Sequence, residues 1–410
     1  MSRLVPLVVG CVLPLTALNG CRDAGGSAPA VTVRDSAGIQ IVENTTPVTT
    51  APAQWTVSDS AVLSIGSAEE DSASLGRVAG AVRLTDGRLV IGDGQSGQLR
   101  FYGSDGTRLV TAGRKGKGPG EFGDIAGLWR GGADSIMAFD FTTRRLSVFD
   151  SSGKFVRHSD LTKAGFLNPL GALRNGTLAS ILFPMEKPSE TTGEYRQPLT
   201  MVLLAPDGAL IDTMAVFQGS TVHNVTMTFG PETASVPSQV QFGPTTILAV
   251  SPDAVYAGDN ARYEIVVYDS AGRITRIIRA VGEARTVTPE DRAKQEEKNL
   301  AMMAQWGGQA PAEIKKQFED QVRSARYAPS FPYFQALLID SQGDLWVQDY
   351  QPPADETRHY SVFDHTGRLI ARASLPPGVR PLHIDRGSIT GLDLDEDDIP
   401  FVRVYPLSRE

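Results

Sequence analysis

The stretch that decides the fold runs from residue 113 to residue 153 of this 410-residue chain. Residues 113–122 read Gly-Arg-Lys-Gly-Lys-Gly-Pro-Gly-Glu-Phe. Three short apolar runs follow: Gly-Asp-Ile-Ala-Gly-Leu-Trp (123–129), Asp-Ser-Ile-Met-Ala-Phe-Asp (134–140) and Arg-Leu-Ser-Val-Phe-Asp-Ser-Ser-Gly (145–153). The last two runs alternate apolar and polar residues, which is the pattern of half-buried strands. The simplest interpretation is a meander of three or four strands entered through a glycine-rich loop.

The same pattern recurs along the chain with three anchors in register. An aspartate ends a short apolar run, an aromatic residue stands nine positions later, and a glycine stands four positions after that. Three copies keep this spacing without a gap: Asp93, Tyr102 and Gly106; Asp140, Phe149 and Gly153; Asp259, Tyr268 and Gly272. The aromatic residue is expected to pack between sheets. The Asp-x-x-Gly that follows it is turn chemistry, because Asp bonds nearby amides and Gly accepts positive φ. We interpret the strand-end aspartates as structural.

The ends of the chain indicate a closed ring. Three looser copies of the repeat stand at 204–208, 344–367 and 388–405, and the last copy lacks its final strand. Residues 35–38 repeat the Asp-Ser-Ala-Gly of residues 269–272, and the apolar run 39–42 follows as a strand. We therefore predict that this N-terminal strand completes the last sheet and closes a ring of six. Periods of about 40–50 residues with several strands each are typical of propellers.

Residues 113–122, with Gly-x-Gly-Pro-Gly-Glu-Phe at their core, resemble the opening of an NHL-type repeat. The following Asp-x-Ile-x-Ala-x-Asp and Leu-x-Val-Phe-Asp-x-x-Gly segments fit the rest of it. The chain from about residue 31 to residue 407 is similar to bacterial six-bladed β-propellers of the NHL/TolB-like group. The resemblance implies an all-β six-bladed propeller over 31–407. It leaves the function open, because that group includes protein-binding modules, sensor domains, lyases and lactonases.

The first residues are typical of a targeting segment. Arg3 supplies a positive charge, and the apolar run 4–18 is too short to span a bilayer comfortably. Leu-Asn-Gly-Cys at 18–21 resembles the bacterial lipobox. We therefore expect a lipoprotein signal peptide at 1–20 and lipid attachment at Cys21.

The predicted anchor has consequences for location and chemistry. Residues 21–30 would form a tether, although ordinary secretion with cleavage near Ala28 is an alternative. The two cysteines are Cys11 and Cys21, so the mature domain would hold no thiol, disulfide or Cys-based zinc site. Arg22, and not Asp, follows Cys21, which favours the outer membrane or the periplasmic face over the inner membrane. We expect an extracytoplasmic, membrane-anchored monomer.

Composition limits the class of partner. The chain is turn-rich, with 41 glycines and 26 prolines, and 21% of its residues are charged, as in globular proteins. Its formal net charge is −8 and no basic face is visible, so we expect no nucleic-acid partner. The expected partners are the membrane, through the lipid, and a protein, peptide or glycan on a propeller face.

One segment is helical in pattern. Thr-Pro-Glu-Asp at 288–291 is a helix start signal, and a second helix is expected to begin near Pro311. We predict a helical hairpin over about 287–328, inserted between blades four and five. It either covers an apolar rim or forms a lid or partner-binding arm; the arm would present Met302, Met303 and Trp306. Residues 217–243 are polar and irregular in pattern and are expected to form a binding or mobile loop.

Candidate chemistry is sparse. The sequence contains no Gly-x-Ser-x-Gly, His-Glu-x-x-His or P-loop motif, and its five histidines are scattered. We assign no catalytic residue, metal ligand or cofactor, although the acidic run 393–398 superficially resembles a calcium loop. Arg114, Lys115 and Lys117 stand among glycines whose amides could help to hold an anion. The alternative for these glycines is the backbone geometry of a connection between blades.

The leading functional interpretation is a lipid-anchored, extracytoplasmic binding or scaffold propeller with no evident catalysis. Two alternatives stay open. One is a metal-dependent lactonase-like or lyase-like propeller enzyme. The other is a sensor or assembly component of an envelope complex.

Overall fold

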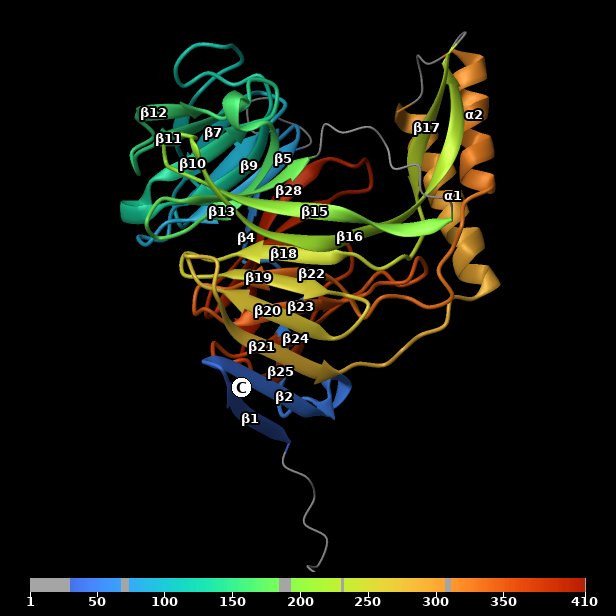
Figure 1. Ribbon diagram of the computed structural model, residues 1–410. Helices are drawn as coiled ribbons and strands as arrows, with labels where there is room; N and C mark the ends of the chain where they lie inside the picture. The colour runs from blue at the N-terminus through green and yellow to red at the C-terminus, as the bar shows by residue number, and fades with distance from the viewer. Residues whose placement is uncertain (1–29, 68–73, 184–192, 230–231, 307–310, 410) are drawn as a thin grey trace, which may run out of the picture.

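The computed structural model describes residues 30–409 except 68–73, 184–192, 230–231 and 307–310, and it consists mainly of antiparallel strands (Figure 1). The predicted signal peptide, the lipid-attachment residue Cys21 and almost all of the tether lie outside the described residues. No helix in the described part is long and apolar enough to cross a membrane.

Strands that are consecutive in the chain pair with one another in meanders. Two four-stranded sheets come first: β5 (Val78–Arg83), β6 (Leu89–Asp93), β7 (Gln98–Tyr102) and β8 (Arg108–Ala112); then β9 (Ile125–Arg130), β10 (Ile136–Asp140), β11 (Arg145–Phe149) and β12 (Phe155–Asp160). A five-stranded sheet follows: β13 (Phe166–Ala172), β14 (Leu178–Phe183), β15 (Glu194–Leu204), β16 (Leu210–Phe229) and β17 (Glu232–Gln239).

The remaining strands form two larger sheets. One contains β18 (Thr246–Val250), β19 (Val255–Asp259), β20 (Glu264–Tyr268) and β21 (Ile274–Val281), extended by β2 (Ile39–Pro47) and β1 (Val31–Ser36). The other contains β22 (Phe334–Ile339), β23 (Leu345–Asp349), β24 (Arg358–Phe363) and β25 (Leu369–Leu375), joined through β3 (Gln54–Val57) to β28 (Pro400–Ser408), β27 (Ser388–Leu394) and β26 (Arg380–Ile384), with β4 (Leu63–Ile65) on β28.

The predicted turn chemistry is present at Asp150. Its carboxylate accepts the backbone N–H groups of Ser152 and Lys154 at 2.9 and 3.0 Å. Gly153, which follows, has a φ of 87°, a conformation that glycine adopts without strain. The amide of Gly153 also donates to the Asp150 carbonyl, which closes the turn between β11 and β12.

Neighbouring meanders pack on one another through clusters of buried apolar side chains. Phe149 is fully buried with Phe101 and Phe122 between the β5–β8 and β9–β12 sheets. The other two repeated aromatic residues, Tyr102 and Tyr268, are also buried in clusters between sheets, as expected. Comparable clusters join each later meander to the next. A sixth cluster joins the last meander to the first, because Val402 of β28 packs with Leu89 of β6. The meanders therefore form a closed circle, which is the arrangement of a β-propeller.

The prediction that residues 39–42 complete the last sheet is wrong, because this strand pairs with a different one. Residues 39–42 belong to β2, which pairs in parallel with β21 from Gln40 opposite Arg276 onwards. The repeated Asp-Ser-Ala-Gly turn precedes both β2 and β21, so the match marks neighbouring parallel strands and not the missing strand of the last sheet. That place is taken by β4, which pairs with β28 through Ile65 opposite Val402.

The end of β28 is fixed by ion pairs. Arg409 contacts Asp340 at 2.7 Å and Asp344 at 3.1 Å, both in the β22–β23 turn. Its guanidinium also lies 4.5 Å from the ring centroid of Trp55 in β3. These contacts join the last strand to two other segments of the ring.

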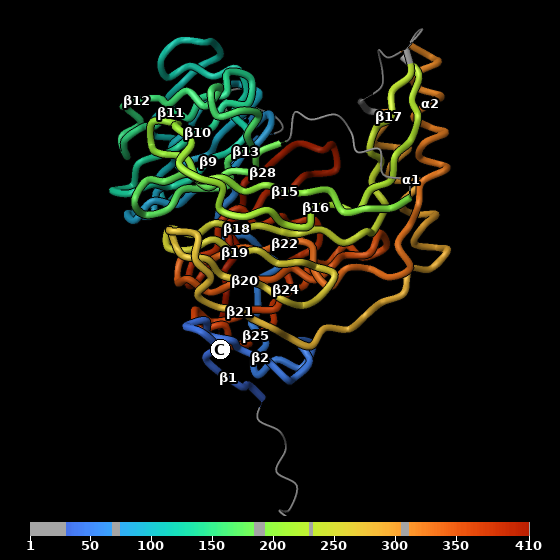
Figure 2. The backbone as a smooth tube through the Cα atoms, viewed as in Figure 1, coloured from blue at the N-terminus to red at the C-terminus, as the bar shows by residue number. Residues whose placement is uncertain are grey.

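An arm projects from the circle (Figures 1 and 2). We define the arm as β16 from residue 221 onwards, β17, α1 (Pro289–Trp306) and α2 (Ala312–Arg323). Residues 217–243 were expected to be irregular, but residues 222–229 pair with 232–239 as a long hairpin. The helices lie within the predicted range 287–328, and α1 begins with a capping pair in which the Asp291 amide donates to Thr288 Oγ1 at 3.2 Å.

Candidate functional site

The glycine-rich loop at residues 113–122 folds back on itself between β8 and β9. The Phe122 amide donates to the Arg114 carbonyl at 2.9 Å, and the Gly116 amide donates to the Phe122 carbonyl at 3.1 Å. A Cβ on Gly113 would lie 2.8 Å from the buried Phe122 ring, so this position needs glycine. The loop's backbone conformation is therefore set by the packing of Phe122 between two sheets.

The three cations of this loop have different surroundings. Arg114 pairs with Glu121 at 2.7 Å, and a bond from the Gly118 amide, followed by Arg114, lowers the pKa of that carboxyl. Lys115 Nζ donates to the carbonyls of Gly94 and Gly123 at 3.0 and 2.6 Å. Lys117 is exposed, and its ammonium has no partner within the described part of the chain. Two of the three cations predicted to bind an anion are thus already engaged internally, and the anion site stays a prediction.

The strand-end aspartates Asp93 and Asp140 accept hydrogen bonds from backbone amides. Asp93 is buried and pairs with Arg100 at 3.0 Å. It also accepts four backbone amides, from Gly76, Arg77, Gln95 and Ser96. Asp140 is equally buried and accepts the amides of Gly123, Asp124 and Thr143. These bonds support the structural interpretation, because each carboxylate ties a strand end to the preceding connection.

The acidic run at 393–398 does not gather ligands around one point. Asp395 accepts the amides of Asp397 and Ile399 at 3.0 and 2.9 Å, and Asp398 has a φ of 60°, as in a tight turn. Among the described residues, no group of three or more His, Cys, Asp or Glu side chains is placed to hold a metal ion.

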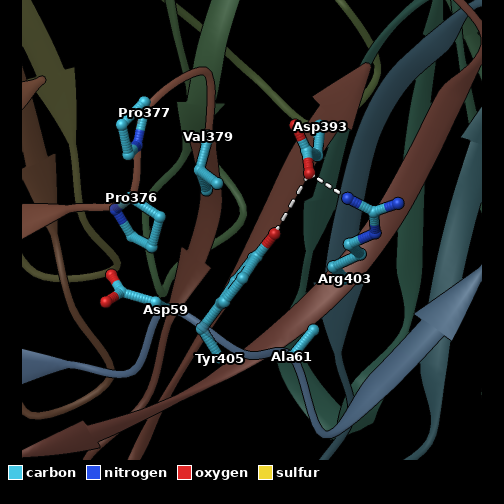
Figure 3. Close-up of a pocket in the computed structure, with 8 residues that line it drawn as sticks. All are labelled: Asp59, Ala61, Pro376, Pro377, Val379, Asp393, Arg403 and Tyr405. Carbon is cyan, nitrogen blue, oxygen red and sulfur yellow. Dashed lines mark hydrogen bonds and ion pairs between the residues drawn. The ribbon is translucent and has the colours of Figure 1, made fainter. Parts of the chain in front are cut away.

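One pocket of about 390 Å³ lies where β27, β28, the β3–β4 connection and the β25–β26 connection meet (Figure 3). Eight residues line it: Asp59, Ala61, Pro376, Pro377, Val379, Asp393, Arg403 and Tyr405. Figure 3 shows Tyr405 and Arg403 pointing toward Asp393 from neighbouring positions on β28. The pocket combines a polar wall with a wall of two prolines and a valine.

The polar wall is a connected set of side chains. Asp393 accepts a hydrogen bond from Tyr405 Oη at 3.2 Å and forms an ion pair with Arg403. Burial, followed by the charge of Asp393, raises the pKa of Tyr405, so the phenol stays protonated at neutral pH. Asp59 has no partner in the described part of the chain and leaves a free carboxylate at the rim. The set can bind hydroxyl or amino groups, and it contains neither a nucleophile with a base nor a metal-ligand group.

Sequence reasoning did not single out this pocket. Asp393 was assigned to the acidic run, and Arg403 and Tyr405 were treated only as strand residues. The available signal was their two-residue spacing, which places both side chains on one face of a strand. Their alignment with Asp393 depends on the pairing of β27 with β28, which the sequence does not display.

Comparisons with known proteins give only distant likenesses. No protein-family model matches the chain, and no curated protein matches it. A protein from Bacteroides fragilis described as exported has 12% identity and a TM-score of 0.49, covering 90% of this chain and 99% of its own. A DUF4221 family member from Bacteroides vulgatus has 8% identity and a TM-score of 0.49, covering 87% and 99%. Virginiamycin B lyase from Staphylococcus aureus has 10% identity and a TM-score of 0.40, covering 87% and 100%.

Proposed function

We propose that this chain is a lipid-anchored six-bladed propeller of the bacterial envelope that binds a protein, peptide or glycan partner. Six clusters between meanders support the blade count, since each joins one pair of neighbours around the circle. We also propose that the propeller is of the NHL/TolB-like group. The proposed domains are a signal peptide at 1–20, a tether at 21–30 and the propeller at 31–407.

The arm is the observation that carries the proposal. The circle of clusters is complete without it, and no described side chain of α2 is buried. Within the arm, α2 is joined to the hairpin, because Gln317 exchanges two hydrogen bonds with the backbone of Thr228, each at 3.2 Å. Gln321 also donates to Ser238 Oγ at 3.1 Å. An ordered projection that contributes little to the core is well suited to contact another molecule.

The exposed side chains of the arm favour a protein or peptide over a glycan. Met302 on α1 is 52% exposed and Phe318 on α2 is 41% exposed. Large apolar side chains held on an ordered surface are frequent anchors of protein interfaces. Trp306 belongs to α1, but its side chain lies outside the described part of the structure.

The position of the arm fits an anchored protein. In Figures 1 and 2, β1 and α2 lie at opposite ends of the molecule. A lipid on Cys21 would precede β1 by a segment that spans at most about 35 Å when extended. The arm would then face away from the membrane, toward partners in the periplasm or beyond the outer membrane.

Two experiments on the full chain in cells test the proposal. A photoreactive phenylalanine analogue at Phe318 is expected to yield a discrete protein adduct that Met302→Glu abolishes. The same analogue at Val156, exposed on the outer strand β12, is the matched control. Equal adducts from both positions, or none from Phe318, would refute a binding arm. Cys21→Ala should move the chain from the membrane fraction to the soluble fraction, and unchanged fractionation would refute the lipid anchor.

The same crosslinking experiment tests the sensor or assembly alternative. An adduct with a component of a membrane complex would favour that alternative. The metal-dependent lactonase-like or lyase-like alternative has no ligand group among the described residues to support it.

A further inference from the structure

A second cavity, of about 440 Å³, lies between the β9–β12 meander and the β13–β16 meander. Its floor is formed by buried apolar side chains: Met137, Leu146, Val148, Leu173 and Leu178. Its rim is polar and rich in arginine: Arg130, Arg157, Arg174 and Asp134. An apolar floor with a few polar groups at this size is the usual composition of a small-ligand pocket.

Two of the rim arginines are neutralised within the protein. Arg174 forms a two-pronged pair with Asp253, with both N–O distances at 2.7 Å. Arg130 lies 3.7 Å from Asp134, whose other oxygen accepts the Thr85 amide at 3.0 Å. In each pair the aspartate offsets the charge of the arginine, so these two arginines add polarity but little net positive charge to the rim.

The third rim arginine has no carboxylate partner in the described part of the chain. Arg157 Nη1 donates to the Pro206 carbonyl at 2.9 Å and to Ser159 Oγ at 3.1 Å. Both acceptors are neutral, so no carboxylate offsets the charge of this exposed guanidinium, and its remaining N–H groups are accessible to a ligand at the rim. An anionic group is the ligand that such a guanidinium binds best.

The turn at the mouth of the cavity is strained. The Ser135 amide donates to the Gly132 carbonyl at 3.1 Å, and the two residues between them, Ala133 and Asp134, have φ values of 51° and 53°. Aspartate tolerates this left-handed conformation, but alanine rarely adopts it, so the strain lies at Ala133, and such strain gathers at functional sites. The strain is independent of the charge on Arg157 and points to the same cavity.

We propose that this cavity binds a small amphipathic anion. The apolar body would lie on the floor, and a carboxylate, sulfonate or phosphate group would accept hydrogen bonds from Arg157. No element of the arm lines the cavity, so this site does not depend on the partner-binding role.

The test uses two fluorescent probes with similar ring systems and different charge. The aromatic sulfonate 8-anilino-1-naphthalenesulfonate is the anionic probe, and the neutral N-phenyl-1-naphthylamine is its control. Both are titrated into the chain from residue 26 onwards, which keeps every described residue. The variants are Arg157→Gln, Arg157→Lys and, as a matched control outside the cavity, the exposed Lys154→Gln.

We expect saturable binding of one sulfonate probe per chain, weakened at least about tenfold in Arg157→Gln. Binding in Arg157→Lys and Lys154→Gln should stay within about threefold of the unaltered chain, because charge is retained in the cavity. The neutral probe should be indifferent to Arg157→Gln. Absence of saturable sulfonate binding, unchanged binding in Arg157→Gln, or equal loss of both probes would overturn the proposal.

A measurement on the unaltered chain avoids any folding defect of a variant. Decanoate or 1-naphthoate should displace the sulfonate probe, whereas neutral decan-1-ol should not. Preference for decanoate would indicate an aliphatic ligand, and preference for 1-naphthoate an aromatic one. Equal displacement by decan-1-ol would show that the anionic group is not recognised and would refute the assignment.

Discussion

Replacing Arg409 with Gln should weaken the attachment of β28 to the neighbouring β22–β25 meander. The side chain of Asp340 is fully buried, and those of Asp344 and Arg409 are 13% and 16% exposed. The substitution leaves two adjacent acids without their shared cation. It also removes the contact with the Trp55 ring, which links β28 to β3.

The expected size of the effect follows from burial. Removing one partner of a buried ion pair costs about 3–5 kcal/mol, mostly because the remaining charge stays buried and unpaired. Asp340 keeps other donors, including Trp346 Nε1 at 3.0 Å and the Gln342 amide at 2.8 Å. We therefore expect the lower end, about 3 kcal/mol. With an unfolding entropy of about 0.8 kcal/mol/K for roughly 380 residues, Tm should fall by about 4 °C.

The effect should depend on pH in a defined direction. Burial, followed by the charge of Asp340, raises the pKa of Asp344, and Arg409 opposes that rise. A carboxyl with a raised pKa favours folding at low pH and loses that contribution as pH rises through its folded-state pKa. In the variant this pKa rises further. The Tm difference from the unaltered chain should therefore be largest at neutral pH and shrink as pH falls and protonation of Asp344 removes its unpaired charge.

The matched control is Arg174→Gln, which removes an exposed ion pair. The side chains of Arg174 and Asp253 are 73% and 67% exposed, so the loss should stay below about 1 kcal/mol, or about 1 °C in Tm. Differential scanning calorimetry of both variants at pH 7.5 and pH 4 makes the comparison. If Arg409→Gln lowers Tm no more than the control does, the role of Arg409 in holding β28 to the β22–β25 meander is wrong.

Four other predictions follow from particular contacts. Ile65→Ala should lower stability by about 2–4 kcal/mol in chemical denaturation, because Ile65 is buried where β4 completes its sheet; a loss under 1 kcal/mol would contradict that role. Ala133→Asn should raise Tm by about 1 °C, since Asn tolerates the left-handed conformation better; a lower Tm would contradict the strain. Replacing Arg114, Lys115 and Lys117 together with Gln should abolish phosphate binding by calorimetry while circular dichroism stays native, and unchanged binding would reject that anion site. Elemental analysis of the chain from residue 26 onwards should find no stoichiometric metal, and chelation should leave Tm unchanged; bound calcium with loss of stability on chelation would favour the enzyme alternative.

Local features of the fold were predictable because their causes are local. The Asp150 turn is encoded within four consecutive residues, and the aromatic residue between sheets follows at a fixed spacing. The partner of β2 was not predictable in the same way. A turn sequence specifies the conformation of its own residues, whereas the choice between β21 and β28 as a partner depends on contacts far away in the chain. The three-residue β4 is too short to show any periodicity.

The β-hairpin of the arm was missed for a different reason. Residues 222–229 and 232–239 are rich in Thr, Val and Ser, which favour strands. Polar and apolar residues alternate from Asn224 to Phe229, and Met227 is buried between the exposed Thr226 and Thr228. The second strand is mostly polar and contains Pro237, so the strand signal was confined to one half of the hairpin and the whole segment was interpreted as a loop. The helices were easier to locate, because the capping residue Thr288 and its partner Asp291 stand within four consecutive residues.

The contrast between two groups of cations shows how the fold limits functional inference from sequence. The cations of residues 113–122 are conspicuous because glycines surround them, yet Arg114 and Lys115 are bound to groups of their own connection. Arg157 stands in an ordinary edge strand, with nothing in the sequence to mark it. Its two acceptors, Ser159 Oγ on the same strand and the Pro206 carbonyl of the next meander, are both neutral. The proposed anion site therefore rests on which cations the folded chain leaves without a carboxylate partner, and the density of charge along the sequence does not show this.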